Sequence, residues 1–442
     1  MPPSAPISTG TADPTHTRAS RWVVLIAAVA LVFDGYDLVV YGTVLPTLLR
    51  DPDQIGALSP EQAGALGSYA MIGVLVGALT AGAVGDHVGR RRVMLVNIAW
   101  FSVGMALTAM TESIATFGLF RFFTGVGVGA LVATAGALVA EFAPAGKRNL
   151  YNAIVYSGVP AGGVLAALVA MLASGAIGWR GLFWVGALPI VILLPLAIVK
   201  LPESPHWLAA RSAVRTSGPA TGRPKVGFAA LATRRYALAT ALLGSMSFAG
   251  LLLTYGLNTW LPEIMGQNGY GTGYSLLFLL ILNLGAILGG LIASRSADRL
   301  GPQRVVATTF TLAAVALVLL PLQLPFALLA LGVAVAGVGT IGTQVLIYGF
   351  VSNYYETVAR AAGVAWCAGF GRLGGIVGPV IGGLLVGAGV GGSTAFTIFA
   401  GVALAGAVVT LLVPRRESDP FTVDTTPLAE PETAAAGSTV TG

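Results

Sequence analysis

Twelve apolar stretches, each long enough to cross a lipid bilayer, dominate this sequence. They lie at residues 22–46, 60–84, 93–111, 113–140, 151–174, 180–200, 236–262, 273–297, 304–321, 325–353, 361–386 and 394–414. A transmembrane helix needs about 20 apolar residues, because the hydrocarbon core of a bilayer is about 30 Å thick. Charged residues supply only 10% of the chain, against about 25% in a typical soluble domain. The sequence therefore predicts an all-α membrane protein with twelve transmembrane helices in the lipid bilayer.

Residues suited to metal, redox or nucleophilic chemistry are scarce. Cys367 is the one cysteine, which excludes an internal disulfide, a multi-cysteine zinc site and a C-x-x-C redox motif. The histidines His16, His87 and His206 lie outside the apolar stretches, and neither H-E-x-x-H nor G-x-S-x-G occurs. We therefore expect no metal, no cofactor and no enzymatic activity.

The positions of Lys and Arg predict the orientation in the membrane. Most of these cations lie before helix 1 or after helices 2, 4, 6, 8, 10 and 12, which places them on one side. Arg50 and Arg180 fall on the other side, and Arg121 and Arg372 lie within apolar stretches. Because loops rich in Lys and Arg face the cytoplasm, we expect both termini to be cytoplasmic and the protein to lie in the plasma or inner membrane. The net charge of +6 then reflects orientation, and no nucleic-acid partner is expected.

Composition divides the chain into five segments. Both ends lack an apolar run and are rich in small and polar residues, which is typical of disordered chain. The long polar stretch between helices 6 and 7 separates two sets of six helices. The predicted segments are a disordered cytoplasmic arm at 1–20, a six-helix bundle at 21–200, a cytoplasmic loop at 201–235, a second six-helix bundle at 236–414 and a disordered cytoplasmic tail at 415–442.

The two sets of helices resemble each other in sequence. G-D-H-V-G-R-R-R-V at residues 85–93 aligns with A-D-R-L-G-P-Q-R-V at residues 297–305, an offset of 212 residues. The same offset carries Arg148 onto Arg360. A shared offset in two separate loops indicates two similar six-helix units related by pseudo-symmetry.

The first copy of this loop resembles a known family. G-A-V-G-D-H-V-G-R-R-R at residues 82–92 is similar to the loop signature G-x-x-x-D-x-x-G-R-R-x of the major facilitator superfamily. The resemblance implies two six-helix bundles and alternating access around a cavity lined mainly by helices 1, 4, 7 and 10. The second copy departs from the signature, with Pro302 and Gln303 where two arginines are expected. The predicted gating residues are Asp86, Arg90, Arg91, Asp298 and Arg299.

Four charges inside the apolar stretches are not repeated in the other half: Asp34, Asp37, Arg121 and Arg372. A charge at mid-membrane costs about 2.5–3.5 kcal/mol on insertion scales, so it usually faces a cavity and has a function. Counting 1.5 Å per residue places Asp37 and Arg121 at similar depth. We therefore predict an ion pair between them.

This charge set suits the coupling of a proton to an anion. Asp34 and Asp37 are three residues apart and share a helix face, so the two carboxylates are expected to share a proton. Arg121 offers a planar fork that matches a carboxylate. Protonation of Asp37 would free Arg121 for an anionic substrate. The competing interpretation is a static pair that holds helices 1 and 4 together, and Arg372 has the same alternative.

A second resemblance concerns the substrate. F-D-G-Y-D-L-V-V-Y-G at residues 33–42 resembles the D-G-x-D signature in helix 1 of the aromatic acid/proton symporters. Its Tyr36 and the run V-V-Y-G at residues 39–42 favour the benzoate carriers over the hydroxybenzoate carriers. Residues 119–129, 255–262 and 369–374 are similar to helices 4, 7 and 11 of that group. The resemblance implies import of benzoate or a hydroxybenzoate with protons. It also implies essential roles for Asp34, Asp37, Asp86, Asp298, Arg121 and Arg372.

An aromatic carboxylate needs a cation, flat apolar walls and polar groups that recognise ring substituents. The predicted substrate-binding residues are Arg121, Arg372, Tyr36, Asn258, Gln344 and Trp366. Further aromatic candidates for the walls are Phe33, Tyr41, Trp260 and Tyr348. Core packing is the competing interpretation for each aromatic residue.

Other transporters of the same superfamily remain alternatives. P-E-S-P at residues 202–205 resembles a segment of sugar porters, and residues 374–383 resemble an antiporter signature, which antiporters carry in helix 5. A proton-coupled porter of a sugar or another metabolite and a drug/proton antiporter therefore stay open, as does a sensor that transports nothing. We expect the protein to act as a monomer.

Overall fold

The computed structural model describes residues 14–144, 148–209, 212, 231–233, 236–322 and 324–414, and all regular structure in these ranges is helical. The first half contains α1 (Pro14–Arg50), α2 (Pro60–Val88), α3 (Arg90–Ala109), α4 (Ile114–Phe142), α5 (Arg148–Tyr156), α6 (Gly158–Ala187), a short 3-10 helix (Leu188–Ile190) and α7 (Leu193–Lys200). The second half contains α10 (Ala237–Gln267), α11 (Thr272–Leu300), α12 (Pro302–Leu319), α13 (Phe326–Gly337), a π-helical turn (Val338–Gly342), α14 (Thr343–Tyr354), α15 (Thr357–Gly387) and α16 (Gly392–Leu412).

These helices cross the membrane twelve times within the described residues. Eleven helical spans are long and apolar enough to cross, and one of them, Leu150–Lys200, contains 51 residues. At 1.5 Å per residue such a helix would measure about 76 Å, more than twice the thickness of the bilayer core. Gly178 interrupts it with φ of +63°, a conformation that glycine adopts at little cost. This break lies between the predicted fifth and sixth helices, so the prediction of twelve crossings is confirmed.

The first helix begins earlier than the sequence pattern indicated. It starts at Pro14, so residues 14–20 are helical, whereas the prediction placed them in a disordered arm. Proline fits the first turn of a helix because its ring fixes φ near the helical value and the missing N–H has no partner there. The remainder of the arm, most of the loop at 201–235 and the tail from 415 lie outside the described residues.

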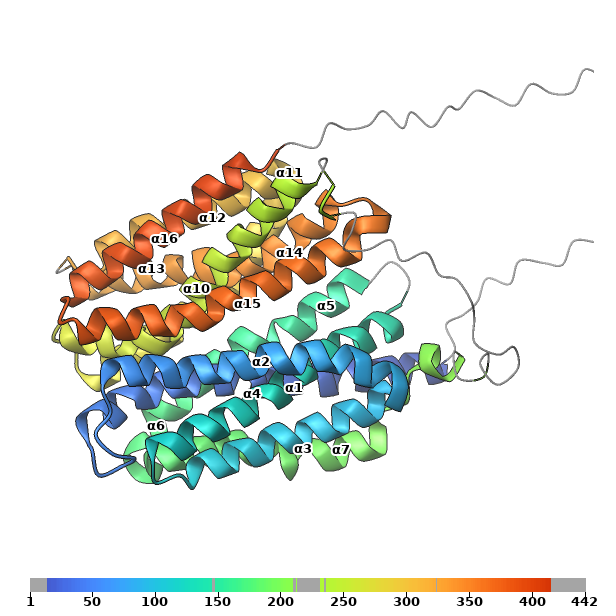
Figure 1. Cartoon of the computed structure of the whole chain (residues 1–442), viewed down its shortest axis with the longest axis horizontal. Coiled ribbons are helices and arrows are strands. Elements are labelled where there is room, and N and C mark those ends of the chain that lie inside the picture. Colours follow the sequence, from blue (N-terminus) through green and yellow to red (C-terminus); the bar gives the residue numbers. More distant parts are fainter. Residues whose placement is uncertain are drawn as a thin grey trace, which may run out of the picture.

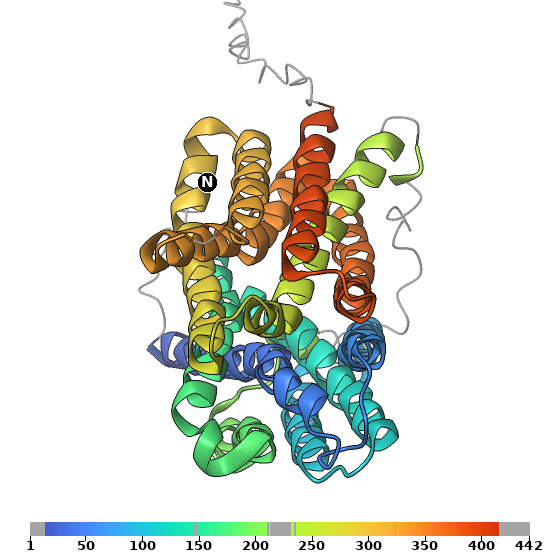
Figure 2. The same ribbon diagram turned by 90° about the vertical axis from the view of Figure 1, so that its left-hand side faces the viewer.

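The helices form two bundles (Figures 1 and 2). Each bundle contains the same glycine turn at the end of one helix. In the first bundle α2 packs on α4 and α1 on α6, and in the second α10 packs on α15 and α12 on α16. Gly89 ends α2 with φ of +103°, and Gly301 ends α11 with φ of +87°. The two glycines are 212 residues apart, so the predicted repeat has the same left-handed turn in both copies.

The two bundles meet closely at one end of the molecule, which we call the closed end and which carries the loop at 51–59. There α2 and α15 lie side by side (Figure 1). A Cβ atom added at Gly64 would lie 2.6 Å from the carbonyl oxygen of Pro379, and one added at Gly383 would lie 2.5 Å from that of Pro60. Glycine is required at both positions because the backbones themselves are in contact.

The bundles separate toward the opposite end, which we call the open end and which carries Gly89. Among the described residues, the two side-chain hydrogen bonds that join the bundles both lie toward the closed end. A Cβ atom added at Gly85 of α2 or Gly369 of α15 would meet no described atom within 4 Å. Figure 1 shows the ribbons of α2 and α15 diverging toward this end.

Candidate functional site

The two aspartates of α1 are buried near the middle of the membrane span. Asp34 and Asp37 are 3% and 0% exposed. Between them, a Cβ atom added at Gly35 would lie 1.9 Å from the carbonyl oxygen of Val159 in α6. This backbone contact fixes the rotation of α1 about its axis, because no larger residue fits between the helices. Asp34 and Asp37 lie about 100° and 200° around the helix from Gly35, so neither shares its position against α6.

Asp37 and Arg121 form a buried ion pair that joins α1 to α4. Nη1 of Arg121 donates to Oδ1 of Asp37, and the two side chains are 2% and 1% exposed. The guanidinium carbon lies 5.4 Å from the ring centre of Tyr41 and 6.0 Å from that of Phe183. Aromatic faces attract a cation, so these rings help to hold Arg121 away from water. The structure thus brings together the two residues that the depth argument paired.

The ion pair leaves hydrogen-bonding groups unused. Nε of Arg121 and Oδ2 of Asp37 have no hydrogen-bond partner among the described residues, and the same is true of Oδ1 of Asp34. A buried charged group without a full set of partners is costly, and such groups are common at functional sites. These atoms can accept a proton or bind an anion without first breaking a complete network.

Arg372 and Asp34 lie within electrostatic range of each other across the seam between the bundles. Tyrosines from three further helices surround them: Tyr156 of α5, Tyr255 of α10 and Tyr348 of α14, each within electrostatic range of Arg372. All three tyrosines are partly exposed. Each of the three therefore keeps part of its surface uncovered within electrostatic range of a cation.

The side chains of Gln344, Asn258 and Trp366, which are predicted to contact substrate, differ in how many of their hydrogen-bonding groups are already used. Gln344 donates to Oγ of Ser247 at 2.9 Å, while its Oε1 has no partner among the described residues. Asn258 is occupied, since it donates to the Thr254 carbonyl at 2.7 Å and accepts from Asn283 at 2.9 Å. Trp366 is 36% exposed and stacks on Phe370. The indole N–H of Trp366 donates to the Thr240 carbonyl at 3.1 Å, so only its ring remains available. Gln344 is the one of the three with a side-chain polar atom that lacks a partner among the described residues.

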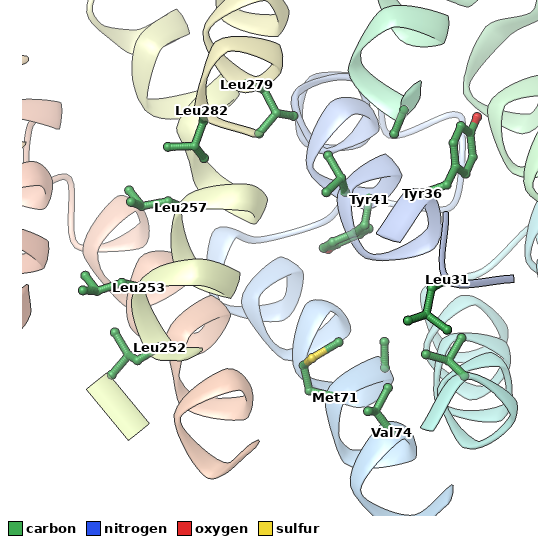
Figure 3. Packing of buried hydrophobic residues seen from close by; sticks show 14 of the residues in the cluster. Leu31, Tyr36, Tyr41, Met71, Val74, Leu252, Leu253, Leu257, Leu279 and Leu282 are labelled. Carbon is green, nitrogen blue, oxygen red and sulfur yellow. The ribbon is translucent and has the colours of Figure 1, made fainter. Parts of the chain in front are cut away.

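Two aromatic candidates belong to the core instead. Tyr36 is fully buried, and its hydroxyl donates to the Leu182 carbonyl of α6 at 2.8 Å. Figure 3 shows Tyr36 and Tyr41 projecting from α1 in different directions. Trp260 is also fully buried and donates to the Pro379 carbonyl at 2.8 Å. Packing between helices accounts for both, and the expectation that Tyr36 contacts substrate is not supported by this geometry.

At the open end, charged side chains connect α3, α4 and the segment after α7. Arg90 pairs with Glu141 of α4, which also accepts a hydrogen bond from Oγ of Ser204. Glu203 accepts from the backbone N–H of Arg91 at 3.0 Å and from that of Ser204 at 3.0 Å. These contacts lie within the first bundle and surround the turn at Gly89.

The remaining predicted gating residues are less informative. The Asp86 side chain lies outside the described part of the chain. Asp298 and Arg299 are exposed at the open end of α11.

Sequence reasoning missed three residues of these clusters: Glu141, Glu203 and Tyr156. Glu203 belongs to the P-E-S-P segment, and the resemblance of this segment to sugar porters does not indicate a contact with the Gly89 turn. Glu141 is an acidic residue at the end of an apolar helix, next to a cationic loop, and that position is a usable signal. Nothing in the local pattern distinguishes Tyr156 from an ordinary core tyrosine.

Sequence comparisons agree with this architecture. A family model described as Major Facilitator Superfamily matches residues 27–295 and 258–435. The gentisate transporter of Corynebacterium glutamicum is 35% identical over 388 residues, covering 87% of this chain and 85% of that protein. The benzoate transport protein of Acinetobacter baylyi is 31% identical over 400 residues, covering 84% of each.

Solved structures show the same fold. The D-xylose-proton symporter superposes with a TM-score of 0.72 at 19% identity, covering 89% of this chain and 98% of that one. An inward open conformation of the xylose transporter XylE from E. coli gives a TM-score of 0.71 at 18% identity, covering 90% and 98%. With two helical bundles, the repeated turn and a family model that spans nearly the whole apolar region, this chain belongs to the major facilitator superfamily.

Proposed function

We propose that this protein is a secondary active transporter that imports a small aromatic carboxylate together with protons by alternating access. The observation that carries the proposal is the buried pair of Asp37 and Arg121, in which Oδ2 of Asp37 and Nε of Arg121 have no hydrogen-bond partner among the described residues. The relatives named for gentisate and benzoate support the substrate class, since both molecules are aromatic carboxylates.

Competition between a proton and the substrate for the same pair would couple them. When Asp37 takes up a proton it loses its charge, and Arg121 then has no anionic partner in the pair. A substrate carboxylate supplies that charge in a fork geometry that guanidinium matches. When the substrate leaves, Arg121 again attracts the Asp37 carboxylate and the proton is released. Arg121 therefore always has one anionic partner, which avoids an isolated buried cation.

Arg372 provides a second cation from the other bundle, and the surrounding tyrosines supply flat walls. An aromatic ring held between Tyr156, Tyr255 and Tyr348 would bury apolar surface while the hydroxyls remain available to ring substituents. Asp34 lies within range of both Asp37 and Arg372. A second proton on Asp34 would leave Arg372 free for the substrate in the same way.

Proton coupling also answers an energetic requirement. An anion that enters a negative-inside cell works against about 2.3 kcal/mol per 100 mV, and each proton that accompanies it cancels one charge. One proton makes import electroneutral, and two allow the membrane potential to contribute.

The placement in the cell follows from the loop charges and is part of the proposal. Arg90, Arg91 and Arg92 lie at the open end, and cationic loops face the cytoplasm. The open end and both termini would then be cytoplasmic, in the plasma or inner membrane, with the protein acting as a monomer. The cluster around Glu141 would regulate closure of this end together with Asp86 and its counterpart Asp298.

Uptake of radiolabelled benzoate into cells that produce the protein tests the proposal. We expect accumulation above the external concentration, its loss with a protonophore, and competition by gentisate but not by D-xylose. Accumulation that a protonophore leaves intact would contradict proton coupling. Competition by D-xylose alone would assign the protein to the sugar porters.

A further inference from the structure

A pocket lies at the closed end, apart from the central charges. It has a volume of about 280 Å³ and is formed by the ends of α1 and α10 and the start of α11. Its lining includes Pro46, Pro262 and Tyr270 as apolar walls and Arg50 as a cation. This volume is near the lower end of the range for small-molecule sites, about 300–1,000 Å³.

The backbones of the two bundles separate this pocket from the central site. A Cβ atom added at Gly42 of α1 would lie 2.0 Å from the carbonyl oxygen of Asn258 in α10. The next residue, Thr43, lines the pocket. Asp37 lies six residues deeper, or about 9 Å along the helix. A molecule in the pocket therefore rests on the outer side of this contact, and Asp37 and Arg121 lie on its inner side.

Arg50 is only partly occupied by its partner. Its Nη2 lies 3.2 Å from Oε2 of Glu263, and the other carboxylate oxygen of Glu263 accepts from Gln267 at 3.1 Å. Glu263 is held in place, with 8% of its side chain exposed, whereas 57% of the Arg50 side chain is exposed. A guanidinium has five N–H donors, so Arg50 retains donors for a second carboxylate within the pocket.

The same pair also connects the two bundles. Among the described residues it is the ion pair that crosses the seam at this end, from α1 to α10. A carboxylate that draws Arg50 into the pocket weakens its bond to Glu263. Binding on the outer side therefore loosens one of the contacts that keep this end closed.

We propose that this pocket is an outer docking site for a small aromatic carboxylate, in which Arg50 binds the carboxylate and Tyr270, Pro46 and Pro262 hold the ring. The inference rests on the proposed function, because the ligand class is that of the transported substrate. Docking there precedes entry into the central site and competes with Glu263 for Arg50.

Cysteine labelling in intact cells tests docking without requiring transport. The chain has one cysteine, Cys367, which is buried. Thr272→Cys places a thiol in the pocket lining, and Tyr274→Cys places one nearby on an exposed residue that is not among the lining residues. The probe is a membrane-impermeant maleimide added outside, with and without benzoate.

We expect benzoate at about ten times its Kd to slow labelling of Thr272→Cys by about tenfold, because only the unoccupied fraction reacts. Tyr274→Cys should react at an unchanged rate. Adding Arg50→Gln should abolish protection, whereas adding Glu263→Gln should preserve or strengthen it, since that change removes the competitor and leaves Arg50 intact.

Several results would overturn the inference. If benzoate does not slow maleimide labelling of Thr272→Cys, or still slows it after Arg50→Gln, then Arg50 does not bind the carboxylate in this pocket. Equal loss of protection in Arg50→Gln and Glu263→Gln would assign the effect to closure of the bundles, as would protection of Tyr274→Cys. No labelling of Thr272→Cys from outside would contradict the outer location. An absence of benzoate uptake in the parent protein would instead count against the proposed function.

Discussion

Asp37 and Arg121 belong to the same bundle, so their ion pair does not cross the seam that opens and closes. The bundles can therefore move relative to each other while the pair stays intact. Protonation of Asp37 or binding of a competing anion to Arg121 is what would separate it. Asp34 and Arg372 differ in this respect, because they lie within electrostatic range of each other on opposite bundles. The central charges thus combine one pair that responds to ligands with another that also responds to conformation.

Replacing Asp37 by Asn should abolish proton-driven accumulation while leaving exchange partly active. The amide keeps the size of the side chain but cannot carry the proton. One pH unit is worth about 1.4 kcal/mol, or about tenfold accumulation per proton, and the variant should instead equilibrate substrate across the membrane. Radiolabelled benzoate uptake with an imposed pH gradient measures this ratio.

Asp53→Asn is the matched control, because Asp53 is an exposed aspartate in the loop at 51–59. It should accumulate substrate as the parent does. Undiminished accumulation in Asp37→Asn would remove this residue from the proton pathway.

Replacing Arg121 by Lys should raise the KM for uptake by about tenfold or more. The charge is kept, but the planar fork is lost, and hydrogen bonds to charged groups contribute about 1.5–3 kcal/mol each. Initial uptake rates over a range of benzoate concentrations give the KM. Arg92→Lys, at an exposed arginine of α3, should leave it unchanged, and a KM equal to the parent's in Arg121→Lys would show that the anion binds elsewhere.

Replacing Gly42 by Ala should reduce the maximal uptake rate by about tenfold. The new methyl group would lie 2.0 Å from the Asn258 carbonyl oxygen, and neither backbone can rotate away. Overpacking of this kind costs about 1–3 kcal/mol, which here falls on the conformation closed at this end. Gly401→Ala in α16 is the control, since a Cβ there meets no described atom within 4 Å; equal rates in both variants would mean that the contact does not limit the cycle.

Replacing Glu141 by Gln should lower the free energy of unfolding by about 1–3 kcal/mol, because Arg90 loses a charged partner at a largely buried carboxylate. Thermal unfolding in detergent measures the change. Glu112→Gln, at an exposed glutamate, provides the comparison. Equal unfolding temperatures for both variants would show that the cluster contributes nothing to stability.

The sequence predicted the features that depend on position along a helix. Counting residues along the two helices places Asp37 and Arg121 at a similar depth in the bilayer. This was enough to predict their ion pair, because partners within the membrane must lie at the same depth. The break near Gly178 lay in the gap between two apolar runs, and the repeated turn at Gly89 and Gly301 followed from one offset. Each of these depends on spacing, which a linear sequence contains.

Features that depend on rotation or on distant segments were not predicted. Tyr36 follows Asp34 by two residues, about 200° around the helix, so its ring contacts α6 and not the cavity. Tyr41 follows Asp37 by four residues and therefore lies over Arg121. Glu141 and Arg90 come from different helices, and their pairing requires a tertiary contact that no periodic pattern contains.

The close approach of α2 and α15 at Gly64 and Gly383 forms a strip of backbone contact between the bundles. Where two peptide chains touch without interposed side chains, attraction comes from many feeble contacts, each about 0.5–1 kcal/mol or less. Such surfaces can separate one contact at a time, so no single contact sets the energy barrier to opening of the closed end. Turnover should consequently be tuned by small changes in temperature or hydrostatic pressure acting along this entire strip.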